Sequence, residues 1–191
     1  MSEDQERLTL LETIKKEHDL LSGRLALLQR EISTWSGHAE PDYDLLHALI
    51  EYFSVFPDEI HHKKEDHIYA ALIGNNVLET DYLKRLKSEH EEMGTLKETF
   101  AKNLENLAAH HVSPKWSLIV DVGKYIEVQE IHMADEESQF LPLAHKELSQ
   151  KQLLEVTEII QHDLITDSAK QTFDTLNRID TTIDEILRKK S

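Results

Sequence analysis

Four histidines and two glutamates recur in the same order in the two halves of this chain. Each half has one histidine and then a second histidine, 43 residues later in the first half and 42 in the second, with a glutamate four positions on. Imidazole and carboxylate groups bind iron, manganese and zinc, and positions i and i+4 share one face of a helix. The pattern predicts a metal site built from His18, His61 and Glu65 of the first half and His90, His132 and Glu136 of the second.

Four helices must carry these residues. Apolar residues spaced three and four apart form one buried stripe of a helix, and they predict helices over residues 5–34, 44–73, 81–109 and 114–142. His18 and His90 stand in these stripes, where an apolar residue is expected. Pro57 should kink the second helix or start a new segment, and Pro142 should end the fourth. Short connections favour an all-α, up-down-up-down four-helix bundle.

A fifth helix is predicted over residues 151–188, after a possible capping box at Ser149 and Gln152. We therefore expect residues 1–148 to form the metal-binding bundle. Residues 149–191 should form an additional C-terminal helix that packs on the bundle or on a partner subunit, so a homodimer through this helix is a possible assembly.

The predicted ligands must also meet at one height, because metal–ligand bonds are only about 2 Å long. Counting from the connecting loops places all six within about two helical rises per comparison, or roughly 3–5 Å. His47 and Glu51 have the same spacing but would lie about 21 Å away along the helix, so this test rejects them. A register with His62 and Asp66, rotated by about 100°, stays open. In the register with His61 and Glu65 as ligands, we expect His62 to contact the ligands without binding the metal itself.

Composition excludes several classes of protein. The 191 residues carry a formal net charge of −16 and no cysteine, so nucleic acid and anionic membranes are not expected partners, and thiolate zinc sites and disulfides are excluded. No apolar run approaches the roughly 20 residues that cross a bilayer, and no signal-peptide pattern opens the chain. We expect a cytoplasmic protein without a membrane partner.

Six side chains cannot saturate two metal ions, even where the two glutamates bridge them. Solvent or a small ligand must complete the site, and iron is the expected metal if that ligand is oxygen, nitric oxide or peroxide; manganese and zinc are less expected. A di-iron enzyme and a structural bundle without metal are the alternatives.

These motifs resemble the hemerythrin-like (HHE cation-binding) family over roughly residues 8–143. The run from His61 to Asp66 is similar to the family's His-His-x-Lys-Glu-Glu element, and the run from His132 to Pro142 is similar to a second one. The resemblance implies a non-haem di-iron domain. Oxygen carriers of the family have a fifth histidine on the third helix, where this chain has Gly94. The set of four histidines and two glutamates is more similar to iron- and oxygen-sensing hemerythrin domains and to iron–sulfur repair proteins. The repair proteins carry an extra cysteine-containing domain, which we do not expect here.

Overall fold

The computed structural model describes residues 3–36, 41–77, 81–108 and 115–190, and these residues form six continuous helices without a strand. Two of the six contain a π-helical turn and are therefore named in parts. The bounds are α1 (Glu3–Ser36), α2 (Tyr43–Phe56), η1 (Pro57–His61), α3 (His62–Gly74), α4 (Asp81–Ala108), α5 (Lys115–Asp135), η2 (Glu136–Phe140), α6 (Leu141–Glu147), α7 (Gln150–Leu164) and α8 (Asp167–Lys189).

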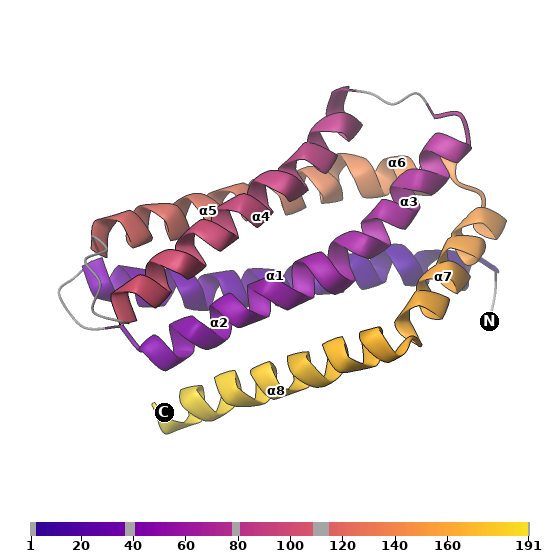
Figure 1. Ribbon diagram of the computed structural model, residues 1–191. Helices are drawn as coiled ribbons and strands as arrows, with labels where there is room; N and C mark the ends of the chain where they lie inside the picture. The colour runs from indigo at the N-terminus through magenta and orange to yellow at the C-terminus, as the bar shows by residue number, and fades with distance from the viewer. Residues whose placement is uncertain (1–2, 37–40, 78–80, 109–114, 191) are drawn as a thin grey trace.

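Four long rods form the bundle, as expected, and successive rods run in opposite directions (Figure 1). They are α1, then α2 to α3, then α4, then α5 to α6. The chain then folds back, so that α7 packs on α1 and α3 while α8 lies along α2. None of the helices described is both long enough and apolar enough to cross a membrane.

Local signals set several helix ends. The Asp42 carboxylate accepts a hydrogen bond of 2.9 Å from the Leu45 N–H and so caps α2. After α3, Asn76 has φ of 58°, and the Val77 N–H bonds to the Leu72 carbonyl, which is the left-handed stop common at helix ends. The predicted start of the fourth helix at Pro114 lies outside the described residues.

Both helix-interior prolines accompany a π-helical turn. Pro57 opens η1, so the second rod continues in a wider turn through the residue where a kink or a new segment was predicted. The prediction that Pro142 ends the fourth helix is wrong, because the rod continues to Glu147. Pro142 stands in the first turn of α6, directly after η2.

The single C-terminal helix that was predicted is also wrong, because two helices form there. The capping box of Ser149 and Gln152 opens α7 as expected, but α7 ends at Leu164. Thr166 then caps α8 by accepting a hydrogen bond from the Ala169 N–H. A threonine cap followed by Asp167 starts a new helix, and the apolar periodicity hid this boundary.

The apolar core has two parts, separated along the bundle. The first packs α2, α5 and α8 against the later half of α1 and most of α4. The second packs α3, α6 and α7 against the beginnings of α1 and α4. Buried histidines and glutamates occupy the level between them.

Candidate metal centre

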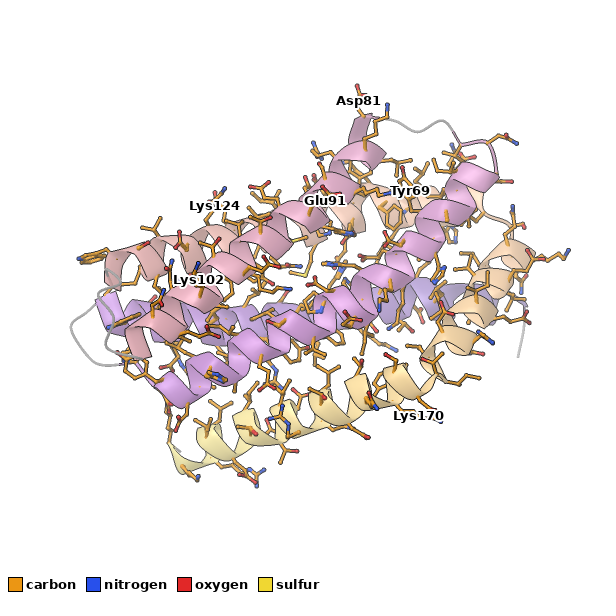
Figure 2. All side chains as sticks on the ribbon, in the orientation of Figure 1. Tyr69, Asp81, Glu91, Lys102, Lys124 and Lys170 are labelled. Carbon is orange, nitrogen blue, oxygen red and sulfur yellow. The ribbon has the colours of Figure 1, made fainter. Side chains whose placement is uncertain are left out.

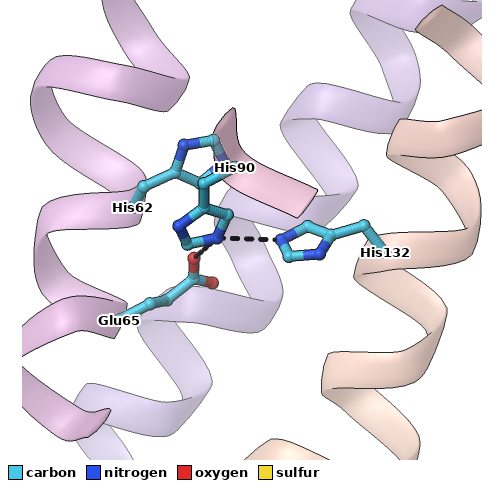
Figure 3. Close-up of side chains that lie close together, drawn as sticks. All are labelled: His62, Glu65, His90 and His132. Carbon is cyan, nitrogen blue, oxygen red and sulfur yellow. Dashed lines mark hydrogen bonds and ion pairs between the residues drawn. The ribbon is translucent and has the colours of Figure 1, made fainter. Parts of the chain in front are cut away.

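The six predicted residues lie together at this level, and His62 joins them. The seven side chains form two overlapping groups, in each of which the candidate ligand atoms lie within 4.8 Å of one another. Site A consists of His18, His61, Glu65 and Glu136. Site B consists of His62, Glu65, His90 and His132 (Figure 3). Glu65 belongs to both, so the two sites are adjacent.

The π-helical turn explains how two neighbouring histidines reach one centre. Consecutive α-helical side chains diverge by about 100°, which is why His61 and His62 were treated as alternatives. The His62 N–H bonds to the Pro57 carbonyl five residues earlier, and this wider turn rotates consecutive side chains by less. The two rings lie 5.6 Å apart, one in site A and one in site B. Turns of this kind often occur at functional sites.

Both glutamates present one oxygen to each side of the centre. Glu65 Oε1 lies 3.1 Å from His61 Nε2, and its Oε2 lies 3.7 Å from His90 Nε2. Glu136 Oε2 lies 3.3 Å from His18 Nε2, and its Oε1 lies 3.1 Å from His132 Nε2. A carboxylate oriented in this way can bind two ions at once.

A second layer of carboxylates orients the imidazoles. His61 Nδ1 donates to Glu17 over 2.9 Å, and His132 Nδ1 donates to Glu89 over 2.9 Å. The two residues of each Glu-His dipeptide therefore have different roles. The histidine belongs to the centre, whereas the glutamate before it accepts a hydrogen bond from a histidine of the next rod. An acceptor on Nδ1 leaves the Nε2 lone pair to a metal.

Two more histidines have a carboxylate on Nδ1. His18 Nδ1 donates to Glu137 over 3.0 Å, and His62 Nδ1 lies 3.5 Å from Asp58. Lysine and arginine side chains pair with three of the carboxylates that contact the histidines. Lys64 pairs with Glu17, Lys97 pairs with Asp58, and Arg85 Nε lies 3.1 Å from Glu89.

The unpaired polar atoms at the centre test whether it suits a cation. Six buried atoms at the centre have no hydrogen-bond partner: Nε2 of His18, His61 and His62, both carboxylate oxygens of Glu65, and Oε2 of Glu136. A buried polar atom left unpaired costs about 1–3 kcal/mol. Six such atoms converge here, and all are imidazole nitrogens or carboxylate oxygens, so the residues fit one or two transition-metal ions.

Burial and the neighbouring charges shift the pKa values of the histidines at the centre in opposite directions. Burial alone would lower the pKa of His18, but the carboxylates of Glu136 and Glu65 outweigh it and raise that pKa to about 10. The pKa of His132 is likewise raised to about 10 against the effect of burial, chiefly by Glu136 and Glu89. Burial and the neighbouring His62 instead lower the pKa of His90 to about 3. The nearby imidazoles hold the pKa of Glu65 well below its ordinary value despite burial.

The residues set aside in the sequence take other places. His47 is exposed, and Glu51 pairs with Arg178 of α8. Asp66 is absent from both groups, so the described structure does not pair it with His62 at the centre. The sequence offered His62 only as an alternative to His61, paired with Asp66, or as an outer support, and did not place both histidines in the centre. Glu137, which accepts the hydrogen bond from His18 Nδ1, was missed. The His61-His62 doublet was the available signal, but ideal helical periodicity separated its two members.

Comparison with known proteins gives one family. Residues 9–144 match the family model described as the Hemerythrin HHE cation binding domain. The match spans the four rods that supply the centre and stops before α7 and α8. No curated protein and no solved structure was found to match the chain.

Proposed function

Because the chain belongs to the hemerythrin HHE cation-binding domain family, we propose that it binds two iron ions at sites A and B and uses them to bind or sense oxygen, nitric oxide or peroxide. Iron is favoured over manganese and zinc by the small redox-active ligands expected here. The observation that carries the proposal is the overlap of two buried histidine and glutamate groups at Glu65.

The two sites differ in how many protein groups they offer. Site A has two imidazoles and site B has three, while both glutamates face both sites. An octahedral ion has about six positions, so the chain offers about four ligands to an ion at A and about five to an ion at B. We infer that a small external ligand binds at site A.

His62 changes the comparison with oxygen carriers. The sequence places Gly94 where those proteins have a fifth histidine, but His62 brings the number of imidazoles at this centre to five. A five-histidine set therefore supports reversible ligand binding as well as sensing. The chain's own residues contribute by orienting the imidazoles through Glu17 and Glu89 and by excluding bulk water through the two apolar cores.

Metal analysis tests the proposal. The metal-free chain is titrated with ferrous iron under anaerobic conditions, and the bound iron is counted for the wild type, Glu65→Leu and His47→Leu. We expect two ions per chain in the wild type and in His47→Leu, and fewer than one in Glu65→Leu, because Glu65 serves both sites. Less than one ion per wild-type chain would refute the proposal.

The oxidised, loaded protein should then show an absorption band of bridged ferric iron that changes when nitric oxide or peroxide is added. Unchanged spectra with both ligands would leave metal binding intact but refute the ligand-binding role.

A further inference from the structure

A cavity lies outside the metal centre, where the C-terminal helices pack on the bundle. It is lined by η1, α3, α7 and the beginning of α8, the end of α8 that Lys170 marks in Figure 2. Its volume is about 310 Å³, and it touches none of the seven residues of the centre. Pockets for small ligands begin at about this size. Because α7 and α8 lie beyond the residues that match the family model, the cavity is not part of the family's domain.

The buried part of the cavity lining is apolar except for one lysine. Ile60 and Ile160 are 3 % and 6 % exposed, and Lys64 is 7 % exposed. A lysine is almost never buried to this extent unless its charge is paired. Glu17 of α1 is the ion-pair partner that the described residues give to Lys64. An ammonium group has three N–H donors, so Lys64 can serve a second acceptor in the cavity.

The other charged groups of the lining are paired with one another. Lys63 Nζ donates to Glu59 over 2.5 Å, and His67 Nε2 lies 3.0 Å from Asp163. Lys64 is therefore the charge that a ligand meets at the buried end. With histidine counted as neutral, the two acids and two lysines of the lining cancel, whereas the whole chain carries −16. An anion is repelled less here than over the rest of the surface.

The mixed lining indicates the class of ligand. Leu164 and Ala169 are half-buried and add apolar surface to that of the two isoleucines, which favours a hydrocarbon group. A lysine ammonium group binds a carboxylate by a charge-assisted hydrogen bond. One buried cation matches one negative charge, so a monocarboxylate with a hydrocarbon part fits the cavity.

Lys64 also connects the cavity to the metal centre. Its partner Glu17 accepts a hydrogen bond of 2.9 Å from His61 Nδ1, and His61 belongs to site A. A carboxylate that shares Lys64 draws part of its positive charge away from Glu17, which becomes a stronger acceptor for His61. A stronger acceptor on Nδ1 makes the imidazole a better metal ligand.

We propose that this cavity binds a small monocarboxylate with a hydrocarbon part, and that the bound carboxylate strengthens metal binding at site A through Lys64 and Glu17. The coupling to metal rests on the proposed function, whereas binding in the cavity does not.

Octanoate is the probe for binding, by isothermal titration calorimetry on the metal-free chain, and octylammonium is the probe of opposite charge. We expect a Kd for octanoate below about 1 mM and binding of octylammonium at least about tenfold weaker. Lys64→Met should weaken octanoate binding about tenfold, the equivalent of about 1.4 kcal/mol. Ala169→Phe should weaken it as much, because the added ring fills the cavity while Lys64 stays. Lys170→Met removes a lysine that is 66 % exposed and lies outside the cavity, so this matched control should bind octanoate as the wild type does.

Equal octanoate affinity in the wild type, Lys64→Met and Ala169→Phe would overturn the site, and so would equal affinity of the wild type for octanoate and octylammonium. If Lys64→Met does not fold, as judged by circular dichroism, then Ala169→Phe decides, because it leaves the pair of Lys64 and Glu17 in place.

The coupling is tested by titrating ferrous iron against a competing chelator, with and without saturating octanoate. Octanoate should tighten iron binding by the wild type about fivefold, at the lower end of usual coupling between sites, and should leave that of Ala169→Phe unchanged. An unchanged or weakened iron affinity of the wild type would overturn the coupling. A chain that binds no iron at all would refute the proposed function, and the octanoate affinities would still decide the cavity.

Discussion

Replacing His62 by leucine should reduce the bound metal from two ions per chain to one. His62 is a member of site B alone, whereas site A keeps His18, His61, Glu65 and Glu136. The change isolates the one imidazole that the sequence motif did not assign to the centre. It also leaves Glu65 and Glu136 untouched, so that site A should load normally.

The effect on stability should depend on metal. Without metal, His62 is 5 % exposed and its Nε2 has no partner, so an apolar side chain of similar size removes a cost of about 1–3 kcal/mol. The change loses the contact with Asp58 and the ring contact with His90, but leucine still packs against the His90 ring. The metal-free variant should therefore be as stable as the wild type or more so. With free metal at about a hundred times Kd, each bound ion adds about 2.7 kcal/mol, and losing one should lower the Tm of the loaded protein by roughly 5–10 °C.

The assay compares metal content and Tm, with and without metal, for the wild type, His62→Leu and His47→Leu. His47 is exposed on α2, so His47→Leu controls for the loss of a histidine. If His62→Leu retains two ions and the full metal-dependent rise in Tm, then His62 does not bind metal and the two-site description is wrong.

Three further predictions follow from the surroundings of the centre. Glu17→Gln should weaken metal binding about 10–100-fold, because Glu17 orients His61 and pairs with the buried Lys64. Glu137→Gln should weaken metal binding less, since the Glu137 carboxylate is 44 % exposed. Equal losses of affinity for the two variants in a competitive chelator titration would contradict this ranking. The metal-free protein should lose stability as the pH rises from about 6.5 to about 10, because the folded-state pKa values of His18 and His132 are raised to about 10 and folding then takes up protons. Urea unfolding at pH 7 and pH 9 measures this loss. The iron-loaded protein should not show it, because the metal replaces these protons. Gly94→Ala should raise the free energy of unfolding by about 0.5–1 kcal/mol, because Gly94 lies inside α4 with open space where a Cβ would stand. A lower free energy of unfolding for this variant in a urea titration would mean that the helix needs glycine there.

The bundle and most of its centre follow from periodicity. His18 and His90 replace apolar residues in otherwise regular stripes, and the His-x-x-x-Glu pairs lie on inward faces. Counting along ideal helices was enough to bring six residues to one level, because the errors in the helix ends were smaller than the reach of the side chains.

What the sequence left open depends on departures from the ideal helix. An ideal helix turns His62 away from His61, but η1 brings both inward. Pro142 was expected to stop a helix, yet η2 precedes it and the rod continues. The break at Thr166 is a local capping choice within an apolar pattern that continues on both sides, so periodicity alone could not locate it.

The division of the core suggests how the molecule holds together. Each apolar cluster has some helices of its own, whereas α1 and α4 contribute to both, and inside the bundle the two clusters meet at a level of buried imidazoles and carboxylates. Each cluster can therefore behave as a separate cooperative unit when that level is weakly bonded. Bound metal would join the units into one, whereas its loss would let the end formed by α3, α6 and α7 open first in hydrogen exchange.

Outside the bundle, α7 belongs to one unit and α8 to the other. The short turn capped by Thr166 joins them, so opening at one end of the bundle would reach the other through this turn as well as along the four rods.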